Sequence, residues 1–147
     1  MEVELNRGPL TFMSDEQIKR VLQDAKTIAV VGLANSPFRP SHGVAAYMQQ
    51  QGYRIIPVNP TIEESLGEKS YKSLRDVPKD IKIDIVDVFR RPDAVPEVAD
   101  QVIELKLPML WLQETVVHEE AAEKARKAGV FVVMNRCILK EHRRLMR

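Results

Sequence analysis

Cysteine, aromatic side chains and long hydrophobic runs are all scarce in this sequence. The single cysteine, Cys137, excludes an intramolecular disulfide. No apolar run approaches the roughly 20 residues that a membrane-spanning helix needs, and residues 1–13 lack the apolar stretch of a secretion signal. These absences predict a cytoplasmic protein with no membrane partner.

An excess of charge of one sign is also missing, because 22 Lys and Arg residues face 21 Asp and Glu residues. No global electric field therefore draws the chain to nucleic acid or to an anionic membrane, which leaves open only a local charged patch. We expect a small-molecule ligand and no nucleic-acid partner. The 147 residues, 44% of them hydrophobic, fit one domain with a single core. We place this domain at residues 14–147, after an N-terminal arm at residues 1–13 that Gly8 and Pro9 keep irregular.

Five short apolar segments alternate with segments of helical period. The expected strands are residues 27–32, 53–58, 83–89, 109–113 and 130–134, and the expected helices are residues 43–51, 94–105, 118–127 and 139–146. An extra N-terminal helix begins at Ser14, where Ser14 and Gln17 form a capping box. Because the strands are too apolar to have a wet face, the alternation predicts an α/β, Rossmann-like, three-layer fold. We expect a doubly wound parallel sheet of about five strands.

Arginine is concentrated in the loops that follow the expected strands. In a doubly wound sheet these loops share the carboxyl edge, where ligands bind and where helix N-termini expose free N–H groups. The arginines are Arg39, Arg90, Arg91 and Arg136. Guanidinium groups beside helix N-termini favour an anionic nucleotide. The alternative interpretation is that these arginines form surface ion pairs with Asp93, Glu114 or Glu63.

The loop after the first strand, GLANSPFRPSHG, indicates a nucleotide without naming it. Gly32 follows the strand and Gly43 lies where a helix opens, but the dinucleotide spacing G-x-G-x-x-G is absent. NAD-binding domains hold the ribose with an acid at the end of the second strand, where this chain has Val58, Asn59 and Pro60. NAD is therefore disfavoured. A Walker A motif is also absent, so the usual phosphate-binding lysine of ATP hydrolysis is missing.

Several stretches, taken in order and spacing, resemble a known family. They are IAVVGLANSPFRPSHGVAAYM, GYRIIPVNP, LGEKSYKSL, VDVFRRPDAVPEV, LWLQ, EEAAEKARKAGVFVVMNRC and EHRR, and together they cover nearly all of residues 27–144. The chain resembles the small single-domain CoA-binding proteins of bacteria and archaea. That family has a Rossmann-type fold related to the N-terminal domain of the succinyl-CoA synthetase alpha subunit. The resemblance implies that coenzyme A or acyl-CoA binds at the carboxyl edge of the sheet.

The resemblance also implies roles for individual residues. Those expected near the diphosphate are Gly32, Ala34, Asn35, Ser36, Arg39 and the helix start Ser41, His42 and Gly43. Those expected to line the adenine and ribose are Val58, Asn59 and Pro60. Those expected to cover the nucleotide edge and meet its phosphates are Phe89, Arg90 and Arg91. Those expected along the pantetheine are Trp111, Gln113 and Glu114.

One position departs from the family pattern, because relatives carry a glycine-containing turn after WLQ where this chain has Glu114 and Thr115. A carboxylate buried beside an anionic ligand is repelled unless an arginine or a proton compensates it. The plainer interpretation makes Thr115 the N-cap of the next helix and Glu114 a solvated neighbour.

The histidines give no sign of catalysis or metal binding. His42 lies at a helix start, where the dipole opposes an imidazolium, so we expect it neutral. His118 and His142 fall in expected helices among charged residues and look solvated. No two histidines have metal-ligand spacing, and we expect no metal. The histidine that succinyl-CoA synthetase phosphorylates lies in its next domain, so that activity is not expected to transfer.

Cys137 is the one nucleophile to weigh. It follows the last strand, opens a helix and adjoins Arg136, and each of these features lowers a thiol pKa. It would then lie on the ligand edge, able to form a mixed disulfide with the CoA thiol. The alternative is a small buried apolar side chain. Trp111 has the same two interpretations, as a stacking platform or as part of the core.

The leading prediction is therefore a protein that binds coenzyme A or acyl-CoA, with no catalytic residues evident because a paired base and nucleophile is missing. One alternative is a sensor of NAD or another adenine nucleotide. Another is an enzyme that acts on a CoA thioester or a CoA disulfide through Cys137. Exposed sheet edges and the N-terminal arm are compatible with a homodimer.

Overall fold

A computed structural model describes residues 12–147, so most of the predicted N-terminal arm lies outside the described residues. Five strands form one parallel sheet in the order β2-β1-β5-β6-β7. They are β1 (Thr27–Val31), β2 (Arg54–Val58), β5 (Ile85–Val88), β6 (Met109–Leu112) and β7 (Phe131–Val133). Each lies within one of the apolar segments predicted as strands. The predicted α/β architecture is confirmed.

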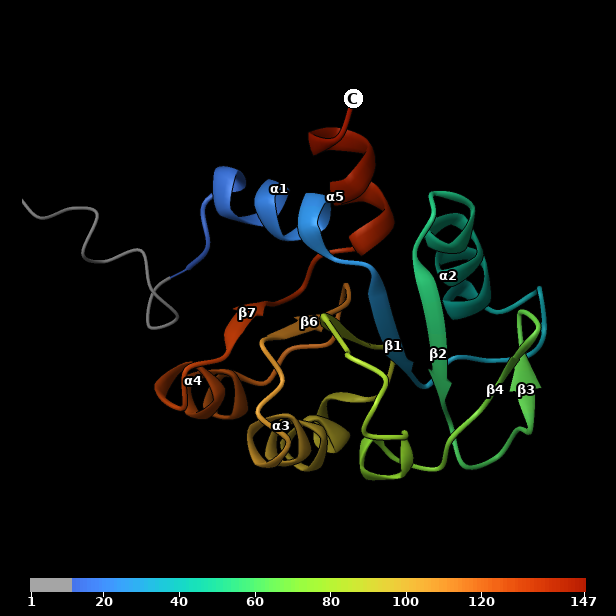
Figure 1. Cartoon of the computed structure of the whole chain (residues 1–147). Coiled ribbons are helices and arrows are strands. Elements are labelled where there is room, and N and C mark those ends of the chain that lie inside the picture. Colours follow the sequence, from blue (N-terminus) through green and yellow to red (C-terminus); the bar gives the residue numbers. More distant parts are fainter. Residues whose placement is uncertain (1–11) are drawn as a thin grey trace, which may run out of the picture.

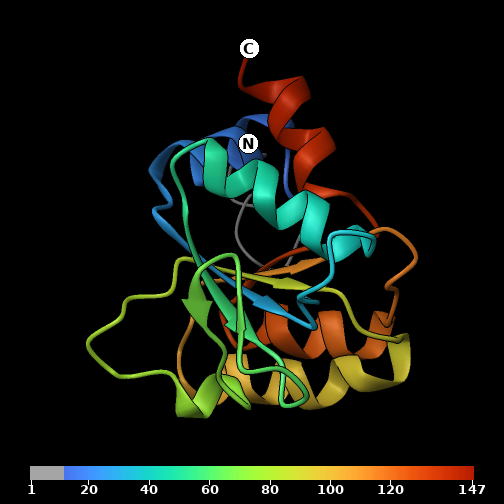
Figure 2. The ribbon, with the colours of Figure 1, turned by 90° about the vertical axis from the view of Figure 1, so that its right-hand side faces the viewer.

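Helices cover both faces of the sheet, which gives three layers (Figures 1 and 2). One face carries α1 (Asp15–Asp24), α2 (Pro40–Gln50) and α5 (Ile138–Leu145), and the other carries α3 (Val95–Glu104) and α4 (Glu119–Lys127). The capping box of Ser14 and Gln17 is present at the start of α1. Helix α2 begins at Pro40, earlier than the predicted residue 43, because proline fits the first turn of a helix.

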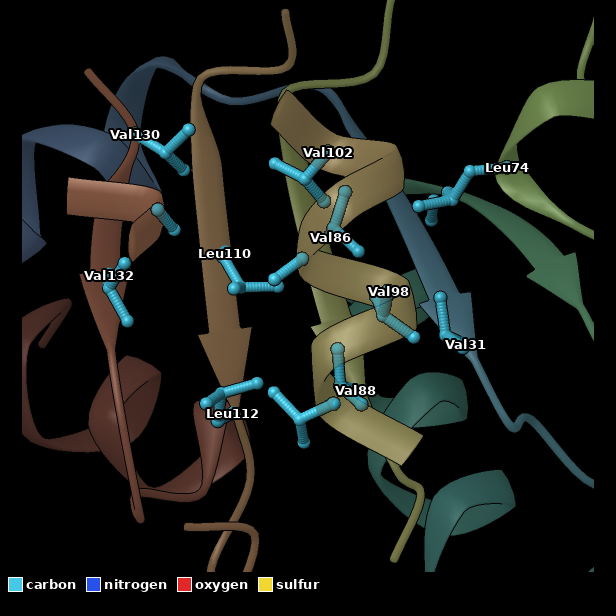
Figure 3. Close-up of a cluster of buried hydrophobic side chains, with 14 of the residues drawn as sticks. Val31, Leu74, Val86, Val88, Val98, Val102, Leu110, Leu112, Val130 and Val132 are labelled. Atoms are coloured by element: carbon cyan, nitrogen blue, oxygen red, sulfur yellow. The ribbon is translucent and has the colours of Figure 1, made fainter. Parts of the chain in front are cut away.

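Each sheet face has its own hydrophobic core. Figure 3 shows the core under α3, where Val98 and Val102 pack on Val86, Val88 and Leu110. Alternate residues of the same strands point to the opposite face, where Trp111 packs with residues of α1, α2 and α5. Burial on both faces explains why the strands read as continuous apolar runs.

The strand order places a topological switch point at the carboxyl ends of β1 and β5. The chain passes from β1 to β2 on one side and then crosses to β5 on the other side of β1. The loops after β1 and β5 therefore diverge and leave a crevice between them, which is the usual ligand position in open α/β sheets.

The connection from β2 to β5 contains structure that the sequence did not predict. Strands β3 (Glu64–Ser65) and β4 (Glu68–Lys69) form a small hairpin around Leu66 and Gly67, which both have positive φ as a type I′ turn requires. A 3-10 turn, η2 (Leu74–Asp76), follows, and a second, η3 (Pro92–Ala94), precedes α3. The segment after the hairpin runs beside β2, with Tyr71 bridged to Val58.

His142 was predicted to be solvated, and this prediction is wrong. The side chain is buried between α5 and α2, and its Nδ1 lies 2.9 Å from the Tyr47 hydroxyl. The rings of Tyr47 and Tyr53 contact the imidazole edge-on. Ile138, His142 and Leu145 follow the i, i+4, i+7 spacing of a buried helix face. Burial lowers the pKa of His142.

Within residues 12–147, no helix has the length and apolar character needed to cross a membrane.

Candidate functional site

A cavity of about 530 Å³ opens at the carboxyl edge of the sheet, between the starts of α2 and α5. We call it the α2–α5 cavity. Its lining includes these predicted site residues: Gly32, Arg39, Ser41, Phe89, Arg90, Arg91, Gln113, Glu114 and Cys137. They come from the loops after β1, β5, β6 and β7 and from the first turn of α2, so the sheet brings together residues that lie far apart in sequence.

Gly32 forms the floor where β1 ends. A Cβ there would lie 2.1 Å from the Phe89 carbonyl oxygen, and φ is +90°. Only glycine allows the backbones after β1 and β5 to approach this closely. The Gly32 N–H donates to the Val58 carbonyl at 2.8 Å, so it is already engaged within the protein.

The loop between β1 and α2 is held by its own hydrogen bonds. The Ala34 N–H donates to Ser41 Oγ at 3.0 Å, and Ser36 Oγ accepts the Phe38 N–H at 3.3 Å. The N–H groups expected from the start of α2 are partly engaged, because His42 and Gly43 both donate to the Arg39 carbonyl. Ser41 lines the cavity, and its hydroxyl proton is free to donate because Ser41 Oγ acts here as an acceptor.

Of the four arginines at the carboxyl edge, two form ion pairs and two form none within the described residues. Arg91 lies 3.6 Å from Asp93, with both side chains largely exposed, so the ion pair contributes about 0–1 kcal/mol. Arg136 pairs with Glu141 at 3.4 Å and does not line the cavity. Within the described part of the chain, neither Arg39 nor Arg90 forms an ion pair. The α2–α5 cavity therefore contains two guanidinium groups that pair with no carboxylate among residues 12–147.

The wall opposite α2 is built from the end of β6 and the start of α5. Gln113 is buried, and its Oε1 accepts the Ile138 N–H at 3.0 Å, which satisfies the start of α5. Cys137 is the N-cap residue of α5 and is buried, as the structural interpretation of this cysteine requires. Glu114 is exposed and lies 3.0 Å from Lys140, whose ammonium group compensates the carboxylate charge. The same contact raises the pKa of Lys140.

Thr115 was predicted to be the N-cap of α4, and this prediction is wrong. Its φ of +69° places it in the left-handed region, and its N–H donates to Asn135 Oδ1 at 2.7 Å. The N-cap is His118, whose Nδ1 accepts the Ala121 N–H at 3.1 Å. Thr115 thus occupies a left-handed conformation that glycine would adopt without strain.

Two predicted site residues act within the fold. Trp111 is fully buried in the core, where its Nε1 donates to the Arg136 carbonyl at 2.8 Å, which confirms the core interpretation. Asn59 donates through Nδ2 to the Leu33 carbonyl at 2.9 Å and accepts the Thr61 N–H at Oδ1. It therefore ties the end of β2 to the loop after β1.

A second cavity, of about 220 Å³, lies beside α3. We call it the α3 cavity. Val58 and Pro60, predicted for the adenine side, line it together with Val31 and Val98. Its polar lining residues are Lys72, Ser73, Arg90, Glu97 and Gln101. Arg90 lines both cavities, so the two are neighbours across the switch point.

Sequence reasoning missed an acid beneath the α2–α5 cavity. Asp87 lies in the middle of β5, opposite Val30 and Trp111 in the register, and is fully buried. Its Oδ1 has no hydrogen-bond partner within the described residues. Burial raises its pKa well above the ordinary value. Val30, Asp87 and Trp111 lie side by side in neighbouring strands. In each strand the residue two positions later, Gly32, Phe89 or Gln113, lines the cavity, so Asp87 lies one layer below the cavity.

No group of three or more His, Cys, Asp or Glu side chains suited to a metal ion occurs in residues 12–147. The candidate site is thus an open crevice with unpaired guanidinium groups, an amide and a thiol, suited to binding an extended anion.

Comparison with known proteins identifies relatives of this chain. Residues 26–143 match the family described as CoA binding domain. The uncharacterized protein YneT of Bacillus subtilis strain 168 is 47% identical over 129 residues, which cover 88% of this chain and 94% of YneT. The solved structure of a hypothetical protein from Pyrococcus horikoshii OT3 is 39% identical, with a TM-score of 0.87 over 92% of this chain and 94% of that one. The ADP-forming acetate–CoA ligase II of Archaeoglobus fulgidus is 32% identical over 75 residues, which cover 50% of this chain and 11% of the ligase.

Proposed function

Because this chain belongs to the CoA-binding domain family, we propose that it binds coenzyme A or an acyl-CoA across the switch point of the sheet. The observation that carries the proposal is the position of Arg90, which lines both the α2–α5 cavity and the α3 cavity. An extended nucleotide can occupy both cavities at once, with its charged centre at the arginine.

The diphosphate belongs in the α2–α5 cavity in this proposal. Arg39 and Arg90 line it without a carboxylate partner within residues 12–147, and the Ser41 hydroxyl adds a donor. Hydrogen bonds between a guanidinium and a phosphate are about twice as strong as neutral ones. The pantetheine then extends along Gln113 toward Cys137, because these residues line the remaining wall of the same cavity.

A binding role is preferred to catalysis because no base lies in hydrogen-bond contact with Cys137 within the described residues. One observation keeps a thiol reaction as the second candidate: Cys137 lines the α2–α5 cavity although little of it is exposed. In that reaction the Cys137 thiolate attacks the sulfur of a CoA disulfide. A Cys137–CoA disulfide forms and the other thiol leaves. Mass spectrometry after incubation with CoA disulfide tests it, and an unmodified chain would exclude it.

The binding proposal is tested by thermal unfolding and calorimetry with CoA, acetyl-CoA and NAD. A ligand at a hundred times its dissociation constant stabilises the fold by about 2.7 kcal/mol. We expect stabilisation by CoA or acetyl-CoA and none by NAD. Stabilisation by NAD alone would replace the proposal with the alternative of an NAD sensor.

Arg39→Gln sharpens the test because Arg39 is exposed and forms no ion pair within the described chain, so the fold does not depend on it. We expect the CoA dissociation constant to rise about tenfold, the scale of one charge-assisted hydrogen bond. Arg20→Gln, at an exposed position on α1, is the matched control and leaves the dissociation constant unchanged.

A further inference from the structure

Resting on the proposed function, we propose that Lys72 and Arg90 form a site for the 3′-phosphate of coenzyme A in the α3 cavity. Neither the sequence patterns nor the diphosphate contacts assign a role to Lys72, which lies in the segment that follows the unpredicted β3-β4 hairpin.

The position of Lys72 is fixed by the backbone on both sides. The Tyr71 N–H donates to the Pro57 carbonyl at 3.0 Å, and the Asn59 N–H donates to the Tyr71 carbonyl at 2.8 Å, so this segment extends beside the end of β2. Three residues later the Leu74 N–H donates to Gln101 Oε1 of α3 at 3.2 Å. Lys72 therefore starts from a fixed backbone at the carboxyl edge of the sheet, where Val58 and Pro60 line the same cavity.

The charges of the α3 cavity favour a phosphate. Lys72 and Arg90 line it, and neither forms an ion pair within the described chain. The one acid in the lining is Glu97. Two cations against one carboxylate leave a net positive charge, which attracts a phosphate monoester.

Glu97 gives the cavity a hydrogen-bond acceptor for the nucleoside part of a ligand. A carboxylate only accepts hydrogen bonds, so Glu97 can accept from the ribose hydroxyl or the adenine amino group, while the phosphate belongs with Lys72 and Arg90. The apolar part of the lining, Val31, Val58, Pro60 and Val98, suits the face of an adenine ring. The cavity therefore matches an adenosine that bears a phosphate.

The two cavities together match a ligand with two separate phosphate groups. Arg90 lies between them, with Arg39 on the side of the α2–α5 cavity and Lys72 on the side of the α3 cavity. Coenzyme A carries a diphosphate and a 3′-phosphate on one ribose, whereas dephospho-CoA and NAD lack the 3′-phosphate. Lys72 would then make the chain selective for CoA over both of them.

The test is a comparison of CoA with dephospho-CoA by calorimetry, using the wild-type chain, Lys72→Gln and Lys82→Gln. Lys82 is an exposed lysine at the opposite edge of the sheet and serves as the matched control. We expect the wild type to bind CoA about tenfold more tightly than dephospho-CoA. Lys72→Gln should weaken the binding of CoA about tenfold and that of dephospho-CoA less than twofold. Lys82→Gln should leave the affinity for both ligands unchanged.

The outcomes separate this inference from the proposed function. Equal affinity of the wild type for the two ligands, or equal weakening of both by Lys72→Gln, would overturn the 3′-phosphate site while leaving CoA binding in place. A wild-type chain that binds neither ligand would overturn the proposed function, and this inference with it. Adenosine 3′,5′-bisphosphate is a second probe, and it should displace CoA at lower concentration than 5′-AMP does.

Discussion

At the scale of single residues, the carboxyl edge of the sheet contains groups that do not serve stability. Arg39 and Arg90 lack carboxylate partners within the described chain, and Thr115 has a positive φ. One layer below this edge, Asp87 is buried with no partner for Oδ1 among the residues that the structure describes. Such features persist where the surrounding structure overrides them, and they gather at functional sites. Their location at this edge or directly beneath it supports a binding role for the edge.

Asp87 makes the stability of the fold depend on pH. Its pKa is raised by burial, so the folded state binds a proton that the unfolded state has released above about pH 4. Stability should therefore decrease as the pH rises from about 4 toward the raised folded-state pKa. Asp87→Asn removes this titration, and we expect it to raise the free energy of unfolding at pH 7 by on the order of 1 kcal/mol or more.

Urea unfolding at pH 4.5 and pH 7 measures this effect. The difference between Asp87→Asn and the wild type should shrink at the lower pH, where the unfolded carboxyl also takes up a proton. Asp80→Asn, at an exposed position, is the control and should change stability by less than about 0.5 kcal/mol. An Asp87→Asn chain that is less stable than the wild type at pH 7 would contradict the argument.

At the scale of elements, α5 couples the site to the rest of the molecule. At its start the Ile138 N–H donates to Gln113, and its last turn is joined to α1 by the Arg144–Asp15 ion pair at 2.8 Å. Between these ends, His142 packs against Tyr47 and Tyr53. The position of Cys137 in the cavity therefore depends on the packing of this helix.

The burial of His142 predicts that α5 loosens in mild acid. The folded-state pKa of His142 lies below its ordinary value of about 6.5, so the unfolded state binds the proton first as the pH falls. Stability should be full above about pH 6.5 and should decrease below it.

His142→Gln tests this because glutamine does not titrate. Between pH 7 and pH 5.5, His142 should lower the free energy of unfolding of the wild type by on the order of 1 kcal/mol or less, and this decrease should be absent from the variant. Urea unfolding at both pH values measures it. The Asp87 effect acts in the opposite direction, so the comparison is made between variant and wild type at each pH. His42→Gln is the control, and an identical slope for wild type and His142→Gln would refute the assignment.

Elements with a strong periodic signal could be predicted from the sequence, and those fixed by long-range contacts could not. The parallel strands are apolar on both faces, and the start of α1 has an explicit capping box. Strands β3 and β4 have only two residues each and no apolar pattern. The N-cap of α4 was misplaced because Thr115 is a good capping residue type whose positive φ only the folded loop reveals.

The same distinction applies to the site. Residues directly after parallel strands could be placed together because the strands end at one edge, and the α2–α5 cavity contains Gly32, Phe89 and Gln113, which follow β1, β5 and β6. Lys72 and Glu97 could not be predicted, because one follows the small hairpin and the other lies on α3. The nearby sequence gave no reason to bring them to the end of β2. Asp87 was hidden by its apolar neighbours in β5, although an acid in a buried strand was itself the signal.

At the scale of the whole molecule, the proposed ligand joins the two helical layers. The α2–α5 cavity lies on the face that carries α2 and α5, and the α3 cavity includes residues of α3 on the other face. A ligand that fills both contacts elements of both layers, with Arg90 between them. Binding should therefore rigidify segments on both sides of the sheet together.

Hydrogen exchange of backbone amides tests this coupling. With saturating CoA, we expect slower exchange in residues 34–44 at the start of α2 and in residues 70–74 beside β2. Dephospho-CoA should slow exchange in residues 34–44 and leave residues 70–74 nearly unchanged, because Lys72 would then have no phosphate to bind. The loop at residues 79–82, at the opposite edge, should exchange at its free rate with either ligand. Protection of residues 70–74 to the same extent by both ligands would mean that the ligand orders this segment through the adenine ring and not through the 3′-phosphate.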